Sequence, residues 1–555
     1  MHNIIKKSIQ TALNEMIEEG FFTDLTEAPE PILSQPRTKG FGDLSTNICM
    51  KLGRSQRKNP GDIALVLSKK LASCDVLEKS EVAAPGFVNF FIKKSCWAEL
   101  LSEILGKGAE YGRLTLGEGA KVQVEFVSAN PTGPLHIGHG RGAAVGDAIS
   151  SILKRAGYDV TKEFYINDMG RQIDVLGRSV YLRASELEGK AVVMPEDAYH
   201  GHYIKDVAAK FIAEKGVAFM DMAEEEAVDI FKEYASEALL GGIREDLKDF
   251  NVEFDVWYSE KSLYEKDLVK KAMDELRKRG FIYEQEGAVW FRSTDFGDDK
   301  DRVLIKADGA RTYFASDIAY HGDKLDRGFT QIINVWGADH HGYEARVRAF
   351  IEAMGREKDA LKVVFIQLVA LLREGEPVAM GKRSGEFVTL RQVMDEVGSD
   401  AARFFFLTRK SDAHLDFDLE LAKKQTPENP VFYVQYCYAR IQSIFGFAKE
   451  KGFTAPDKFS PEALECLNLP EEIELIKHLA NFESVIEKSA SGLEPHRVTF
   501  YLMELAGLFH PYYNKNRVVT EDRGLTEARL LLLKAAGGVT RIGLKLLGIS
   551  APEKM

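Results

Sequence analysis

The sequence predicts an α/β protein with a doubly wound parallel sheet, and three observations support this prediction. Apolar segments suited to buried strands alternate with helical segments over residues 111–415. A loop rich in Pro and Gly, residues 128–142, joins the first of these strands to a helix. Beyond residue 419 no strand pattern is found, and apolar residues recur with the helical period. We therefore expect a central α/β domain followed by an all-helical one.

The first 110 residues predict a separate α+β domain. Apolar residues near the start recur at helical spacing, namely Ile4, Ile5, Ile9, Leu13 and Met16. A second helix is expected over residues 60–73 and a strand over residues 86–92. The Gly-rich segment 106–120 indicates a linker to the next domain.

The central domain is predicted over residues 111–415. Its first strand, 122–127, is followed by the loop and helix of residues 130–156. Further strands of the same domain are expected at 158–165, 288–292, 331–335 and 362–366. Residues 181–260 hold 19 acidic and 8 basic residues, and we interpret this stretch as an acidic helical insertion.

The last domain, residues 416–555, is expected to be a helical bundle. Its apolar residues recur at helical spacing at Val431, Val434, Ile441 and Ile444, and again from Leu530 to Leu547.

Composition limits the classes of function. No run of about 18 apolar residues is present, so no membrane partner is expected. The start lacks the apolar region of a signal peptide, and the five cysteines lie far apart without a CxxC pair. These features predict a cytoplasmic protein with reduced thiols and no cysteine-built metal site.

The net charge of −12 argues against a nucleic-acid partner, but its distribution does not. The acidic stretch 181–260 accounts for nearly all of the excess. Residues 51–70 hold six basic residues and one acid, and residues 515–555 hold eight basic and four acidic residues. Such patches can contact phosphates, although a solvated helix face is the alternative for either one.

The segment from Ser128 to Gly142 carries the chemistry. It follows a strand and enters a helix, so free backbone N–H groups and the helix dipole favour a phosphate there. His136 and His139, separated by Ile-Gly, can both donate to phosphate oxygens. Gly138 leaves room for an adenine or a ribose. A metal-binding His pair and a helix-capping His are the alternatives.

The same residues carry a resemblance to a known family. The run from Glu125 to Gly142 contains His136-Ile-Gly-His139 and resembles the HIGH region of class I aminoacyl-tRNA synthetases, most closely the arginyl-tRNA synthetases. Four further segments resemble that family: Tyr165–Asp168, Tyr313–Asp317, Gly337–Tyr343 and Leu546–Met555. The resemblance covers essentially the whole chain. It implies a Rossmann-like catalytic domain between an N-terminal tRNA-contacting domain and a C-terminal anticodon-binding domain.

The resemblance also implies an ATP site. His136, His139 and Lys382 would be catalytic, and Pro134, Gly138, Met380 and Arg383 would contact ATP. The segment from Ala379 to Gly385 departs from the family's KMSKS consensus, because Ala379 and Gly381 replace a lysine and a serine. Some relatives compensate with a lysine before HIGH, where this chain has Gly133. We therefore assign neutralisation of the phosphates to Lys382, against the alternative of an ordinary basic loop.

For arginine, the resemblance implies Glu125 and Asn130 at the α-amino and carboxylate end. Tyr313 and Asp317, four residues apart on one helix face, would read the guanidinium group. Asp339 would bind the amino group of the ligand or the ribose. A planar guanidinium presents five donors, whereas lysine presents a point charge, so buried carboxylates can reject lysine without an editing domain.

The implied function is that of an arginine–tRNA ligase. L-arginine would be activated by ATP to arginyl-adenylate, with Mg²⁺ arriving with ATP and no protein metal site, and then transferred to tRNA(Arg). Contacts to tRNA are expected from Tyr433, Tyr436, Arg440, Lys515 and Arg517, with Tyr438, Tyr512 and Tyr513 as further candidates. The bundle core is the alternative for each tyrosine.

We expect a monomer without a DNA partner. Two other functions stay open at this point. One is a small nucleotidylyltransferase, which also uses HxGH. The other is an inactive relative of the synthetases that only binds RNA.

Overall fold

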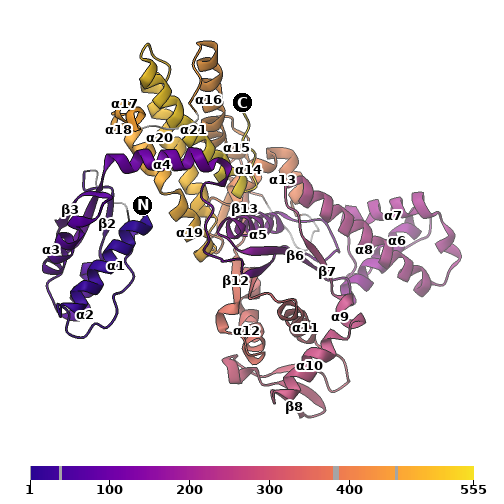
Figure 1. The fold of residues 1–555 in the computed structure, drawn as a ribbon. Helices are drawn as coiled ribbons and strands as arrows, with labels where there is room; N and C mark the ends of the chain where they lie inside the picture. The colour runs from indigo at the N-terminus through magenta and orange to yellow at the C-terminus, as the bar shows by residue number, and fades with distance from the viewer. Residues whose placement is uncertain (1, 35, 37–39, 379–386, 457–460) are drawn as a thin grey trace.

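The computed structural model describes residues 2–34, 36, 40–378, 387–456 and 461–555. Figure 1 shows an N-terminal unit of helices and strands, a central sheet and a helical bundle. The N-terminal sheet is antiparallel, with strand order β1-β2-β4-β3. The elements of this unit are α1 (His2–Glu18), β1 (Leu33–Ser34), β2 (Leu44–Thr46), α2 (Ile48–Gln56), α3 (Pro60–Lys70), β3 (Leu77–Ala83) and β4 (Phe87–Ile92). The predicted first helix, the helix from residue 60 and the strand ending at residue 92 are confirmed.

The central sheet is parallel, with strand order β12-β11-β5-β6-β7. Its strands are β5 (Lys121–Glu125), β6 (Asp159–Ile166), β7 (Val256–Ser259), β11 (Gln331–Gly337) and β12 (Leu361–Ile366). The chain runs from β5 through β6 to β7 on one side and then returns to β11 and β12 on the other side of β5. Because the winding direction reverses between β5 and β11, their carboxyl ends form the crevice where such sheets bind ligands.

Helices cover both faces of this sheet (Figure 1). The helix α5 (Ile137–Arg155) lies on one face, and α11 (Tyr313–Asp326) and α12 (Glu344–Ala353) lie on the other. Val122 and Val124 join the core on the α5 side. A Cβ at Gly146 would lie 2.2 Å from Phe126, so glycine allows α5 to approach the sheet this closely. The predicted doubly wound architecture is confirmed.

One predicted strand belongs elsewhere. Residues 288–292 were expected in the parallel sheet, but β9 (Ala288–Phe291) pairs with β8 (Ile282–Gln285) and β10 (Arg302–Ile305) in a separate antiparallel sheet. The turn between β8 and β9 explains this, since Glu286 and Gly287 both have positive φ, as a tight hairpin requires. The prediction of a parallel strand here is wrong.

The acidic stretch 181–260 is helical only in part. The helices α6 (Arg171–Leu187), α7 (His202–Lys215) and α8 (Glu224–Asp249) project to one side of the sheet and pack around their own apolar cluster. Phe211, Phe219 and Phe231 lie in that cluster, so the acidic side chains are left on its outside. However, β7 lies within the same stretch and pairs with β6. Assigning all of 181–260 to a helical insertion is therefore wrong at its carboxyl end.

The remaining elements before the bundle connect these parts. They are α4 (Lys94–Lys107), α9 (Lys261–Glu265), α10 (Leu268–Lys278), β13 (Val369–Arg373), β14 (Glu376–Pro377), α13 (Leu390–Val397), α14 (Ser399–Phe406), β15 (Leu415–Asp418) and α15 (Leu419–Lys423). The expected domain boundary at residue 415 falls inside β15, which pairs with β13.

The rest of the chain is a helical bundle, and no strand follows β15 among the described residues. Its helices are α16 (Pro430–Glu450), α17 (Pro461–Cys466), α18 (Pro470–Ala480), α19 (Phe482–Gly492), α20 (His496–Lys515) and α21 (Arg523–Leu546). The predicted all-helical domain is confirmed.

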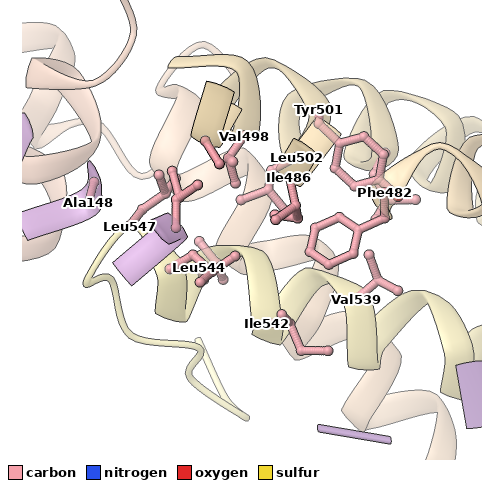
Figure 2. Close-up of a cluster of buried hydrophobic side chains, with 14 of the residues drawn as sticks. Ala148, Phe482, Ile486, Val498, Tyr501, Leu502, Val539, Ile542, Leu544 and Leu547 are labelled. Atoms are coloured by element: carbon pink, nitrogen blue, oxygen red, sulfur yellow. The ribbon is translucent and has the colours of Figure 1, made fainter. Parts of the chain in front are cut away.

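The bundle is fixed to the central domain through α5. Figure 2 shows apolar side chains that include Phe482, Ile486 and Leu547 with Ala148 of α5, and all four belong to one buried cluster. The buried guanidinium of Arg403 adds a polar tie, since it donates to Asp147 of α5 at 2.6 Å and to the Leu547 carbonyl at 3.0 Å. These contacts hold the bundle against α5, whose N-terminal end carries His136 and His139.

The N-terminal unit also contacts the bundle. Asp43 accepts a hydrogen bond from the backbone of Ile92 and forms an ion pair with Lys477 at 2.7 Å. Farther along the chain, the hydroxyl of Tyr111 donates to the Leu479 carbonyl of the bundle at 3.2 Å. Within the described parts of the chain, no helix combines the length and the apolar character needed to cross a membrane.

Candidate active site

The candidate site begins with a strained turn at the carboxyl end of β5. Val127 and Ser128 both have positive φ, which is unusual for residues other than glycine and rarer still for a β-branched one. The Ser128 hydroxyl donates to Glu125 at 3.0 Å and accepts the Tyr165 backbone N–H at 3.2 Å. The turn therefore fixes the carboxylate of Glu125 at the mouth of the sheet.

The two histidines form a reciprocal cap at the start of α5. The Nδ1 of His136 accepts the backbone N–H groups of Gly138 at 3.1 Å and His139 at 3.3 Å. The Nδ1 of His139 accepts the backbone N–H of His136 at 3.3 Å. Since each Nδ1 accepts, the proton of each neutral ring is carried on Nε2. The capping alternative is thus present, and it leaves the Nε2–H side of both rings compatible with donation to a phosphate.

The histidines and the glycine between them pack closely. The two imidazole rings stack with centroids 3.6 Å apart. Burial, with a smaller contribution from the neighbouring His136, lowers the pKa of His139 to about 3, so His139 is neutral near pH 7. A Cβ at Gly138 would come within 3.0 Å of the His136 ring, which gives glycine a second use here. Pro134 is half-buried and lines a hollow against α8.

The predicted lysine loop lies outside the described residues. This applies to Met380, Lys382 and Arg383. The described residues that follow it are bound to the histidine segment. The Val388 carbonyl accepts the Ile137 N–H at 3.2 Å, and the Leu390 N–H donates to the Leu135 carbonyl at 2.7 Å. These bonds hold the carboxyl flank of the loop beside the start of α5.

A group of carboxylates forms the other half of the site. Asp317 lies in the second turn of α11 and accepts a hydrogen bond from the Tyr343 hydroxyl. Burial, together with the charges of Glu260 and Glu125, raises the pKa of Asp317 to about 7, although the hydrogen bond from Tyr343 opposes the rise. Burial also raises the pKa of Glu260, and the charge of Asp168 adds to this effect. Burial and neighbouring negative charge, which together raise the pKa of Asp317, favour a cationic ligand beside it.

Tyr165 lies beside these carboxylates. Burial raises the pKa of its hydroxyl, and the charges of Glu260, Asp317 and Glu125 raise it further. Its ring packs on Tyr320 of α11 at 4.5 Å. A half-buried phenol beside three carboxylates can contact the flat face or the N–H groups of a ligand.

Glu125 has a buried counterion. The ammonium of Lys324 donates to its Oε2 at 2.6 Å and to Asn334 at 3.1 Å. Lys324 is 0% exposed, whereas Glu125 is 8% exposed. The lysine is therefore shielded from solvent, and the carboxylate lies between it and the crevice.

The other predicted arginine contacts are more exposed. Asn130 is half-buried and donates to Gln172 of α6 at 2.6 Å. Tyr313 begins α11 one turn before Asp317, as predicted, but its side chain is 76% exposed. Asp339 is exposed on the 3₁₀ helix Ala338–Tyr343 after β11. The structure thus groups Glu125 and Asp317, and it places Tyr313 and Asp339 at the rim.

Three residues of this half, Tyr165, Glu260 and Tyr343, had no predicted role. Glu260 follows β7 directly and was hidden in the stretch interpreted as a helical insertion. Tyr343 ends a segment that resembles the family, yet only its contact with Asp317 reveals a role. A strand assignment at residues 256–259 would have placed Glu260 at the carboxyl edge of the sheet.

Three of the predicted tRNA contacts lie together on the bundle. Arg440, Lys515 and Arg517 line one hollow together with Tyr513. The guanidinium of Arg440 lies over the rings of Tyr436, at 4.9 Å, and Tyr513, at 5.2 Å.

Other aromatic candidates serve packing. The ring of Tyr433 packs on His510 at 4.5 Å. Tyr438 and Tyr512 are buried, and Tyr512 donates to Glu472, so both belong to the core as the alternative held.

The basic segment 51–70 is largely accessible. Lys51, Arg54, Arg57 and Lys69 are exposed, whereas Lys70 pairs with Glu15 and Glu19. Among the described residues, no group of three or more His, Cys, Asp or Glu side chains is placed to hold a metal ion, and the five cysteines are unbridged.

Comparisons with known proteins agree with this geometry. Residues 100–416 match the model of the class I tRNA synthetase (R) catalytic domain. Residues 3–92 match the arginyl-tRNA synthetase N-terminal domain, and residues 434–555 match the DALR anticodon-binding domain.

Individual proteins match over nearly the whole chain. An arginine–tRNA ligase of Citrifermentans bemidjiense is 52% identical over 97% of this chain and 98% of its own length. One of Desulfosudis oleivorans is 50% identical, with both chains fully covered. The arginyl-tRNA synthetase of Thermus thermophilus shares the fold, with a TM-score of 0.79 at 23% identity over the full length of both chains.

Proposed function

This chain belongs to the arginyl-tRNA synthetases of class I, and on that premise we propose which of its residues carry out each part of the reaction. The activity is the ATP-dependent ligation of arginine to tRNA(Arg). The reaction needs one pocket for a cationic amino acid and one for a polyanionic nucleotide, side by side. The carboxylate group and the histidine cap meet this requirement at the carboxyl edge of β5.

Arginine binds in the pocket formed by the clustered carboxylates. Asp317 and Glu260 accept the N–H groups of the guanidinium, with Tyr165 and Tyr343 shaping the same pocket. Glu125 accepts the α-ammonium, and Asn130 contacts the carboxylate end. Tyr313 and Asp339 close the site from the rim. The observation that supports this assignment is the raised pKa of Asp317, to which the charges of Glu260 and Glu125 contribute, because a guanidinium relieves that repulsion.

ATP binds beside the histidine cap at the start of α5. The Nε2–H groups of His136 and His139 donate to phosphate oxygens, and the dipole of α5 favours negative charge at its N-terminus. Pro134 and Gly138 contact the nucleoside, and Met380, Lys382 and Arg383 lie in the loop that approaches the phosphates. Lys382 neutralises the charge of the departing pyrophosphate.

The reaction proceeds in two steps. A carboxylate oxygen of arginine attacks the α-phosphorus of ATP, the bond to the β-phosphate oxygen breaks, and pyrophosphate leaves. A hydroxyl of the terminal adenosine of tRNA then attacks the carbonyl carbon of arginyl-adenylate, loses its proton, and AMP leaves. These side chains mainly position the reactants and stabilise charge.

Magnesium enters with ATP, because the phosphates of ATP supply the oxygen ligands that this ion prefers. The tRNA lies along the N-terminal unit and the bundle, with Tyr433, Tyr436, Arg440, Lys515 and Arg517 near the anticodon. We infer a monomeric cytoplasmic enzyme that binds neither DNA nor membranes.

Charging assays test this function. The full chain is incubated with a tRNA(Arg) transcript, ATP and labelled arginine, lysine or citrulline, which has the shape of arginine without its charge. Arginine should be charged, and lysine and citrulline should be disfavoured by about 10⁴ or more. Adenylylation without any transfer to tRNA would instead favour a nucleotidylyltransferase, and no reaction would favour an inactive RNA-binding relative.

A further inference from the structure

The polar side chains between the central sheet and α11 form one connected layer. The strand register sets Glu125 beside Asn334 on one side and Glu163 on the other. These side chains face α11, where Lys324 and Arg327 meet them. Lys324 donates hydrogen bonds to Glu125 and Asn334, and Arg327 forms an ion pair with Glu163. Each strand glutamate therefore has its own cation from the same helix.

The Lys324 ammonium has two hydrogen-bond acceptors and one aromatic ring beside it. Glu125 accepts at 2.6 Å and Asn334 at 3.1 Å, and the ring of Tyr320 lies 4.2 Å from the nitrogen. A fully buried ammonium is stable only with such pairing. The lysine cannot contact a ligand itself, since it is 0% exposed. Any part in recognition must pass through Glu125.

The layer continues from Lys324 to Asp317. The amide of Asn334 meets His321 at 2.9 Å, and the other ring nitrogen of His321 meets the Asp317 carbonyl at 2.8 Å. A carbonyl only accepts, so Nδ1 of His321 donates to it and Nε2 accepts from Asn334. The amide oxygen of Asn334 is thereby turned towards Lys324. These hydrogen bonds connect the carboxylate of Glu125 to the turn of α11 that carries Asp317.

We propose that Lys324 is a positioning residue for the α-ammonium of arginine, acting by holding the carboxylate of Glu125 oriented towards the crevice. The proposal rests on the assignment of Glu125 made above. The Oε2 atom of Glu125 binds Lys324 and its Oε1 atom binds Ser128, so its orientation is fixed before any ligand arrives. The strained turn at Val127 and Ser128 serves the same end.

Two partial ligands separate this role from a structural one. Agmatine keeps the amine of arginine and lacks its carboxylate, whereas desaminoarginine keeps the carboxylate and lacks the amine. Inhibition of aminoacylation is measured for both with the full chain and tRNA(Arg) transcript, together with KM for arginine. In Lys324→Met, KM for arginine and Ki for agmatine should rise about 30-fold or more, while Ki for desaminoarginine changes less than about threefold.

Controls make the outcomes distinct. Lys162→Met removes a lysine paired with the buried Asp147 at 3.2 Å on the opposite face of the sheet, and it should leave all three values within about threefold. Glu125→Gln should show the same selective loss as Lys324→Met. If it does not, the assignment of Glu125 falls, and the proposal falls with it. If Glu125→Gln is selective and Lys324→Met weakens all three ligands equally or none of them, only the role of Lys324 is overturned.

Asn334→Ala covers the case in which Lys324→Met does not fold. It keeps both charges and removes one acceptor of the ammonium, so Glu125 and Lys324 lose their fixed orientation. The same selective pattern should result, with a loss of about threefold to tenfold for arginine and agmatine. An equal loss for all three ligands would overturn the proposal.

Discussion

The two halves of the active site differ in how they treat charge. The histidine half offers a helix N-terminus and imidazoles, of which His139 is held neutral by burial. The arginine half buries Asp317 and Glu260 so closely that their proton affinities rise. A neutral array of donors accepts many anions, whereas crowded carboxylates accept only a ligand that supplies positive charge at the right place. On the proposed assignment, selectivity therefore resides in the arginine half and catalysis in the histidine half.

The largest effect is expected from removing charge in the arginine half. Asp317→Asn keeps the shape of the side chain but leaves a neutral amide facing the guanidinium. The value of kcat/KM for arginine in aminoacylation should fall by about 10³ or more, with KM for ATP little changed. Asp326→Asn, on the same helix but in a surface pair with Lys271, is the control. A near-normal arginine affinity in Asp317→Asn would contradict the division.

The next effect concerns the predicted lysine loop beside the histidine half. Lys382→Ala should lower the rate of arginine activation by about 10²–10³ and leave the affinity for arginine nearly unchanged. Pyrophosphate exchange in the presence of tRNA measures the rate, and Arg383→Ala should have a smaller effect. Unchanged turnover in Lys382→Ala would show that another group neutralises the phosphates.

A smaller effect separates the two uses of His136. Asn is an effective N-cap but lacks the Nε2–H donor, so His136→Asn should keep the start of α5 intact. We expect kcat to fall about 100-fold while Tm changes by no more than about 3 °C. Kinetics and thermal unfolding are measured on the same preparation. A large drop in Tm with little loss of kcat would reduce this histidine to a cap.

The smallest effect lies in the bundle, far from both halves. Arg440→Met keeps the length of the side chain and removes the charge from the hollow shared with Lys515 and Arg517. KM for tRNA should rise about threefold to tenfold, with KM for arginine unchanged. Tyr512→Phe, which removes a buried hydroxyl, should lower stability without changing KM for tRNA. The reverse pattern would move the tRNA contact away from this hollow.

The two halves also differ in how far the sequence reveals them. The histidine half is one contiguous segment, so its strand, turn and helix could be predicted together. The arginine half joins β5, the end of β7, α11 and the segment after β11. Glu260 was missed because β7 has only four residues among acidic neighbours, and Lys324 because its partners are set by strand register. Tyr512 and Tyr513 are adjacent in sequence, yet only the packing of the bundle shows that Tyr512 is the buried one.

Proton linkage of arginine binding tests the central claim, that arginine is recognised by buried and mutually repelling carboxylates. The raised pKa of Asp317, about 7, means that this group is largely neutral below pH 7. Without arginine, its contribution to folding stability falls as pH rises from about 4 to about 7, because the folded state holds the proton more tightly than the unfolded chain does. Arginine offsets this loss by binding the ionised form.

The direct measurement is the affinity for arginine against pH, by titration calorimetry of the tRNA-bound enzyme. The affinity should rise by up to about tenfold per pH unit between about pH 5.5 and pH 7 and level off above about pH 8. The same titration of Asp317→Asn should show weak binding without this step. A wild-type affinity that stays flat from about pH 5.5 to pH 8, or a step that persists in Asp317→Asn, would contradict the account.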